Sequence, residues 1–126
     1  MSKVTSNRLG VQLDIIARKS ASFHRIIHSQ ILSGDTLVDF DLSVYSGATL
    51  EVRKSYNSPV VELTFSTSAG SITLDVAGRF ILQLTADEMN VLRSGEYVYD
   101  MYLSSDTYAR RDFIFGTFTI TEKVTT

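Results

Sequence analysis

Two histidines, His24 and His28, are the side chains of this sequence best suited to bind one metal ion together. On a helix, their spacing would place both imidazoles on one face. We interpret the segment as a strand instead, because Phe23, Arg25 and Ile27 alternate with the histidines. Four residues of strand span about 13 Å, too far for an ion whose bonds measure about 2 Å. The spacing therefore predicts two separate, partly exposed histidines and no metal site.

Three aspartates, Asp35, Asp39 and Asp41, form the other group that could bind a cation. Hard cations such as Ca²⁺ take six to eight oxygen ligands, and carboxylates supply them. The segment lacks the glycine and the glutamate that a calcium-binding EF-hand loop carries at fixed positions. These residues are more typical of turns and of the beginnings of strands.

No motif of a known catalytic site is present. The sequence has no Gly-x-Ser-x-Gly elbow, no Gly-x-Gly and no Walker-type phosphate loop, and it has no cysteine. Spacing alone leaves a Ser-His-Asp arrangement open. We expect that the protein is not an enzyme and that it needs no cofactor.

One short helix is predicted near residues 85–94. Thr85 and Glu88 have the spacing of a capping box, in which the threonine hydroxyl accepts from the Glu88 amide while the glutamate reaches back. Met89 and Leu92 would then face the core, and Gly95 would be the left-handed C-terminal cap. Asp87 and Glu88 are therefore interpreted as first-turn acids rather than as a catalytic pair.

The rest of the chain alternates apolar and polar residues over short stretches, which is typical of half-buried strands. We predict about eight strands, a long loop over 32–38 and polar turns between the others. The strands are expected over 13–17, 23–28, 48–54, 60–66, 71–76, 79–84, 97–103 and 110–122. This pattern predicts a mainly β fold, an immunoglobulin-like antiparallel β-sandwich.

Length and composition fit one domain. We predict a flexible N-terminal arm over residues 1–10 and a single sandwich domain over 11–126. The net charge is −2 and the basic residues are scattered, so we expect no nucleic-acid partner. No apolar run is long enough for a membrane span and no secretory signal is evident, so synthesis in the cytoplasm is expected.

Aromatic residues are the richest feature, with six tyrosines and seven phenylalanines. Those at alternating strand positions are expected in the core: Phe65, Phe80, Tyr97, Tyr99 and Phe118. The last strand is apolar on both faces, with Phe113 and Phe115 predicted on the same one. Exposed tyrosines are common in interfaces and sugar sites. The candidate interface residues are Phe113, Phe115, Tyr45, Tyr56, Tyr108 and, in the arm, Lys3 and Asn7.

Several segments in a fixed order resemble a module of tailed phages: Asp41-Leu42-Ser43, the Arg53-bearing strand 48–54, Ile72-Thr73-Leu74-Asp75, Leu84-Thr85, Tyr97-Val98-Tyr99-Asp100 and Gly116-Thr117-Phe118. Over about residues 12–122 the chain is similar to small immunoglobulin-like β-sandwich structural proteins, such as the N-terminal domain of the phage upper baseplate protein.

This resemblance implies a virion structural protein in the baseplate, the tail or a fibre attachment. It implies contacts with other virion proteins or with copies of the same chain, and it implies no catalytic residues. The alternative is a carbohydrate- or receptor-binding sandwich that uses Tyr45, Tyr56 or Tyr108 on its loops.

Overall fold

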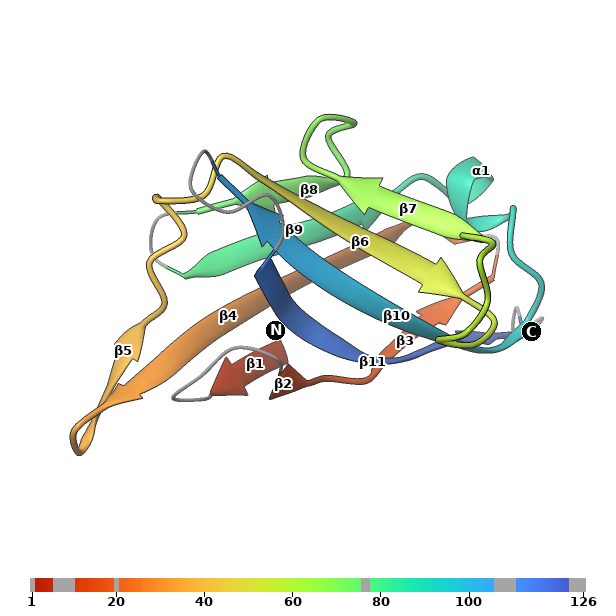
Figure 1. Cartoon of the computed structure of the whole chain (residues 1–126). Coiled ribbons are helices and arrows are strands. Elements are labelled where there is room, and N and C mark those ends of the chain that lie inside the picture. Colours follow the sequence, from red (N-terminus) through yellow and green to blue (C-terminus); the bar gives the residue numbers. More distant parts are fainter. Residues whose placement is uncertain (1, 6–10, 20, 76–77, 106–110, 123–126) are drawn as a thin grey trace.

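The computed structural model of the chain describes residues 2–5, 11–19, 21–75, 78–105 and 111–122 (Figure 1). Over these residues the fold is mainly β, two curled sheets that face each other, which confirms the predicted β-sandwich. The strands are β1 (Ser2–Thr5), β2 (Val11–Gln12), β3 (Ile15–Arg18), β4 (Phe23–Ser33), β5 (Thr36–Asp39), β6 (Gly47–Arg53), β7 (Leu63–Ser66), β8 (Ile72–Leu74), β9 (Arg79–Leu84), β10 (Gly95–Ser104) and β11 (Arg111–Thr121).

The strand order is that of an immunoglobulin-like sandwich. One sheet has the order β1-β4-β9-β8, with β5 also paired to β4, and the other has the order β2-β11-β10-β6-β7, with β3 also paired to β11. The central triplets β4-β9-β8 and β11-β10-β6 match the two sheets of the immunoglobulin fold. Most strand pairs are antiparallel, as predicted, but β1 runs parallel to β4, and β2 and β3 run parallel to β11.

The core lies between the sheets, where the inward-facing residue of each alternating strand is buried. Along β6, buried and half-buried residues alternate without a break. Three rings from three strands, Phe23, Phe65 and Phe118, meet with centroids 5.9–6.0 Å apart. The prediction of core aromatics is confirmed, since Phe65, Phe80, Tyr97, Tyr99 and Phe118 are all buried.

The helix is shorter than predicted. α1 spans Ala86–Met89, and its capping box is confirmed, with Thr85 and Glu88 each accepting from the other's backbone amide. Met89 and Leu92 are buried, also as predicted. The helix ends at Met89, however, with Asn90 as its C-terminal cap, and Gly95 instead begins β10. Among the described residues, no helix is long and apolar enough to cross a membrane.

The last strand contains an irregularity that the alternation did not predict. In the pairing of β10 with β11, Met101 is opposite Ile114 and Tyr102 is opposite Asp112, so Phe113 is skipped. Such a bulge turns two successive side chains to the same side. Phe113 and Ile114 are therefore both buried, while Phe115 faces outward. The expectation that Phe113 and Phe115 share a face is wrong.

The predicted arm contributes a strand to the structure. Ser2–Thr5 form β1, which pairs with β4 from Ile27 to Gln30. The remainder of the arm, residues 1 and 6–10, lies outside the described residues. The predicted flexibility of the arm stays a prediction.

Candidate protein interface

A two-stranded ribbon extends from the sandwich at the far end of β4. Gln30–Ser33 of β4 pair with Thr36–Asp39 of β5, and we call these two segments the β4–β5 ribbon. Figure 1 shows the ribbon projecting beyond the two sheets. All four residues of β5 are exposed. The predicted loop over 32–38 is therefore wrong, and the segment is a hairpin.

The turn of the ribbon is made by Gly34 and Asp35. Gly34 has a φ of 64°, in the left-handed region that glycine adopts without steric cost. A Gly-Asp pair between two apolar stretches is a hairpin signal. The sequence therefore contains a hairpin signal, which the prediction of a loop over 32–38 did not use.

The base of the ribbon is held by backbone contacts around Ser29, which is buried. Its amide and its hydroxyl both donate to the Gly78 carbonyl at 2.8 Å, and its carbonyl accepts from the Phe40 amide at 3.0 Å. Gly78 has a φ of 79°, and a Cβ placed there would lie 2.6 Å from the Ser29 oxygen. Only glycine fits this junction, where the partner of β4 changes from β9 to β5.

A polar cluster lies beside that junction. Asp39 Oδ1 is 2.6 Å from His28 Nε2 and accepts from Gln30 Nε2 at 3.3 Å. The hydrogen bond from His28, followed by that from Gln30, lowers the pKa of Asp39 below its ordinary value, and the positive charge of Arg79 adds to this. These side chains join β5 to β4 at the base of the ribbon. Gln30 Oε1 is buried and has no hydrogen-bond partner among the described residues.

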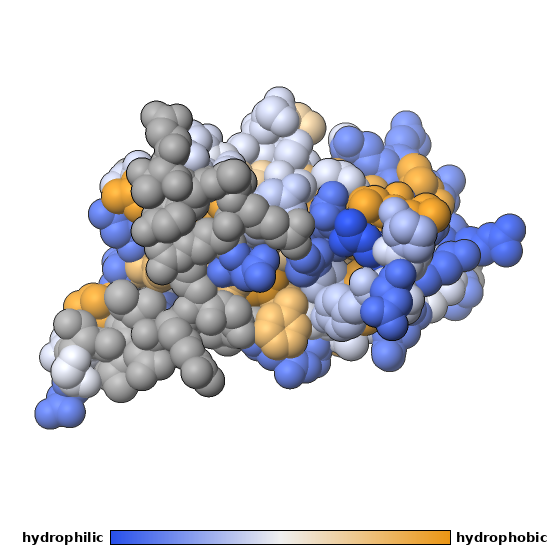
Figure 2. All heavy atoms as spheres, in the orientation of Figure 1, coloured by the Kyte–Doolittle hydropathy of each residue, from blue (hydrophilic) through white to orange (hydrophobic). Residues whose placement is uncertain are grey.

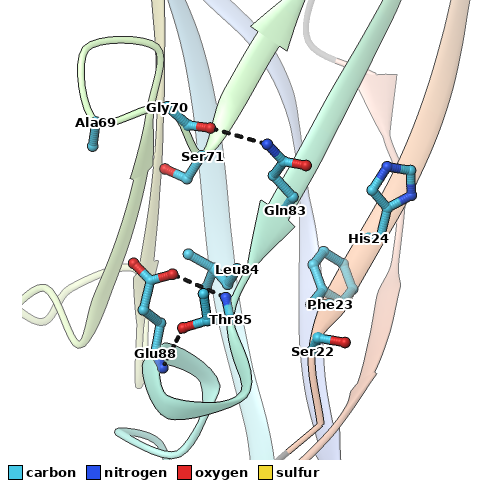
Figure 3. A pocket seen from close by; sticks show the side chains of 10 residues that line it. All are labelled: Ser22, Phe23, His24, Ala69, Gly70, Ser71, Gln83, Leu84, Thr85 and Glu88. Atoms are coloured by element: carbon cyan, nitrogen blue, oxygen red, sulfur yellow. Dashed lines mark hydrogen bonds between the residues drawn. The ribbon is translucent and has the colours of Figure 1, made fainter.

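A pocket of about 390 Å³ opens at the other end of the sandwich (Figure 3). Phe23, His24, Gln83 and Glu88 are among the residues that line it. Two of its polar groups are engaged within the fold, since Glu88 caps the helix and Gln83 Nε2 donates to the Gly70 carbonyl at 3.3 Å. Ser71 and Thr85 also make hydrogen bonds within the fold, so four of the six polar side chains that line the pocket are engaged there.

The two histidines lie on one strand, as predicted. Both belong to β4, His24 is exposed, and His28 contacts Asp39. Of the three aspartates, Asp35 lies in the ribbon turn, Asp39 ends β5, and Asp41 accepts from the Ser43 amide at 2.9 Å. Over the described part of the chain, no group of three or more His, Asp or Glu residues could hold a metal ion.

Two of the predicted interface residues are part of the core instead. Phe113 is 3% exposed and packs between the rings of Phe40 and Phe80, each with a centroid 5.5 Å away. Tyr45 is 7% exposed and stacks on Phe40, although it lies in a loop. The predictions that these two residues are available on the surface are wrong. A loop position does not reveal burial when the loop folds back over a sheet end.

The other interface candidates either are exposed or have side chains that the structure does not describe. Phe115 is 37% exposed on β11, and Tyr56 is 56% exposed. The Tyr56 hydroxyl donates to the Gly116 carbonyl at 3.1 Å, which fixes its ring over the outside of the sheet. Lys3 lies in β1, where only the backbone is described, and Asn7 and Tyr108 lie outside the described residues. Their roles as interface residues stay predictions.

Comparisons with known proteins give a likeness of fold only. No protein-family model matches the sequence, and no curated protein matches it. The structure is similar to the N-terminal domain of phage TP901-1 ORF48, with a TM-score of 0.54 and 10% identity over 98% of this chain and 100% of that chain. It overlaps less with CopC from Methylosinus trichosporium OB3b, with a TM-score of 0.41 and 11% identity over 94% and 90% of the two chains, and this likeness supports no conclusion. The chain therefore shares its fold with a domain of a phage protein.

Proposed function

We propose that the chain is a structural protein of a tailed-phage particle and that it acts through contacts with other virion proteins in the baseplate, the tail or a fibre attachment. The observation that carries this proposal is the fold shared with a phage protein domain over nearly the whole of both chains. The ordered segments of the sequence that resemble a phage baseplate module support the same role.

The surface of the molecule fits a role in assembly. A rigid sandwich supplies a block of fixed shape, and the β4–β5 ribbon supplies an exposed extension anchored at Ser29 and Gly78. Phe115 and Ile16 add exposed apolar residues on β11 and on the adjacent β3.

The test is the composition of purified particles. Phage particles from the source culture are banded on a density gradient, and their proteins are identified by mass spectrometry and by immunogold labelling with antibody to this chain. We expect the chain in the particle band, with label at the tail or baseplate. Absence from both the band and the labelled particles would contradict the proposal, whereas label at the head would keep the structural role and change its place.

The alternative, a glycan- or receptor-binding module, has less support. It uses Tyr45, Tyr56 or Tyr108, and of these Tyr45 is buried while Tyr108 lies outside the described residues. Tyr56 is exposed, but its hydroxyl is engaged with the Gly116 carbonyl. A titration with host polysaccharides, followed by tyrosine fluorescence, tests this alternative directly.

A further inference from the structure

The outer edge of β5 is the feature of the surface that fits a particular kind of partner. β5 pairs with β4 along one edge, and no described strand pairs with its other edge. In an antiparallel pair, backbone groups point alternately toward the partner strand and away from it. Half of the amides and carbonyls of β5 therefore point outward, and such an edge can pair with an added strand.

Proteins prevent strand addition with lysine, proline, a bulge, a covering segment or a very short edge strand. Among the described residues the edge of β5 carries no lysine, proline or bulge and no strand covers it, although β5 is only four residues long. β5 reads Thr-Leu-Val-Asp, pairs with β4 in regular register, and exposes Leu37 by 44% and Val38 by 38%. In contrast, β1 covers the opposite edge of β4, and β2 and β3 cover the edge of β11. Figure 2 shows apolar surface on the ribbon and a hydrophilic tip.

The charge of the ribbon selects a basic partner. Between His28 and Arg53 the sequence has no lysine, arginine or histidine, and Asp35 and Asp41 lie on either side of β5. The third carboxylate, Asp39, contacts His28 and interacts with the charge of Arg79, so it contributes less negative charge to the edge. Opposite charges on facing strands stabilise a pair of strands, and like charges destabilise it. A strand that carries lysine or arginine at its ends therefore complements this edge.

A second copy of the chain fits the edge less well. Residues opposite each other in an antiparallel pair share a face, so the two-fold axis of a β5–β5 pair must pass through a residue position. An axis at Leu37 places Asp39 opposite Asp35 of the other copy, and an axis at Val38 places Asp39 opposite Leu37. The first arrangement opposes like charges, and the second opposes a carboxylate with an apolar side chain.

We propose that the free edge of β5 binds an extended segment of a different protein, rich in β-branched residues and carrying lysine or arginine at its ends, which adds one strand to the sheet. This inference rests on the proposed function for the identity of the partner as a virion protein, but the chemistry of the segment follows from the edge itself.

The test uses the purified full chain and a displayed library of random 12-residue peptides. We expect the enriched peptides to alternate β-branched residues with lysine or arginine. When one of these peptides is synthesised and bound to the chain, hydrogen exchange of the β5 amides should slow. Val38→Lys places a positive charge on the edge, which repels the basic residues of the peptide and should weaken peptide binding at least tenfold. The matched control is Val91→Lys, at a 67% exposed valine that follows α1, at the opposite end of the molecule (Figure 1). If Val38→Lys does not show the native thermal unfolding transition, Thr36→Lys is tested as a second variant of the edge.

Three results would overturn the inference: no enrichment, enrichment of acidic or proline-rich peptides, or equal loss of binding in the edge and control variants. Because the assay contains no phage particle, it is independent of the proposed function. Peptide binding by a protein that is absent from particles would keep this inference and reject the function, and presence in particles without peptide binding would do the reverse.

Discussion

The sandwich body and the β4–β5 ribbon are both built from short strands, but only the body buries them. β6 alternates buried and half-buried residues along its whole length, whereas β5 is exposed at every position. The difference arises because β6 faces a second sheet and β5 extends past it (Figure 1). A strand therefore gains its stability from the layer that covers it, and a ribbon without such a layer depends on its anchor.

The largest expected effect comes from emptying the centre of the body. Phe118→Ala removes a fully buried ring that packs against Phe23, Phe65 and Tyr99, and we expect a loss of about 3–5 kcal/mol in the free energy of unfolding. The measurement is urea denaturation followed by circular dichroism. Phe115→Ala, on the same strand but outward, is the control and should cost less than about 1.5 kcal/mol. Equal costs would mean that the two faces of β11 are not as different as their burial indicates.

The second test acts at the junction between the two regions. Gly78→Ala places a Cβ against the Ser29 carbonyl at a positive φ, so we expect a loss of about 2–4 kcal/mol and faster amide exchange throughout β5. Gly70→Ala also has a positive φ, 83°, but no atom lies within 4 Å of its new Cβ. This control should cost only about 1 kcal/mol. If the β5 amides exchange as slowly in Gly78→Ala as in the wild type, the ribbon is anchored elsewhere.

A third test concerns a buried hydroxyl of the body. Tyr99 is 1% exposed and its hydroxyl donates to the Leu13 carbonyl, so Tyr99→Phe should cost about 1–3 kcal/mol. Tyr56→Phe, at a half-exposed tyrosine, should cost less.

The same hydroxyl gives the body an alkaline limit. Burial, with a smaller contribution from the charge of Asp14, raises the pKa of Tyr99 far above its ordinary value. Unfolded tyrosine ionises from about pH 10 while folded Tyr99 stays protonated, so its contribution to stability falls as the pH rises above that value. Denaturation at about pH 8 and about pH 10.5 should show a weaker pH dependence in Tyr99→Phe than in the wild type.

The smallest effect is expected in the ribbon itself. Asp39→Asn removes the carboxylate that His28 and Gln30 contact, and should increase the mobility of β5 amides with little change in global unfolding. Because the folded pKa of Asp39 is lowered, its contribution is present above the unfolded value of about 4 and is lost as the pH falls through the folded value. Heteronuclear relaxation of β5 amides, compared with those of β10, measures the effect. If the relaxation of the β5 amides is unchanged both in Asp39→Asn and in the wild type at acid pH, the aspartate does not hold the ribbon.

Much of the body could be predicted from the sequence because its strands obey a period of two. The strands around Leu50, Phe80 and Tyr99 and the capping box at Thr85 are confirmed. The length of the helix was overestimated because Gly95 resembles a C-terminal cap, although it begins a strand. The bulge at Phe113 was missed because its cause lies in the pairing with β10, which is a tertiary contact.

The candidate interface was harder to predict than the core. The sequence indicated which residues are apolar or aromatic, but not whether a neighbouring segment covers them, as Phe40 covers Tyr45. The ribbon was missed as a strand pair, although the Gly34-Asp35 turn signals a hairpin. Its outer edge depends on the absence of a neighbour among the described strands, and no local sequence pattern encodes that absence.

The parallel pairing of β3 with β11 has a consequence for how the chain folds as it is made. Ile15 is opposite Phe118, and the Thr121 hydroxyl donates to the Ala17 carbonyl across a separation of 104 residues. Contacts between such distant segments form slowly, because a long loop must close first. During synthesis, β3 therefore cannot pair with β11 until nearly the whole described chain has left the ribosome. The edge of β10 that β11 covers also stays open until then, and this is the stage at which the chain is most exposed to pairing with other nascent strands.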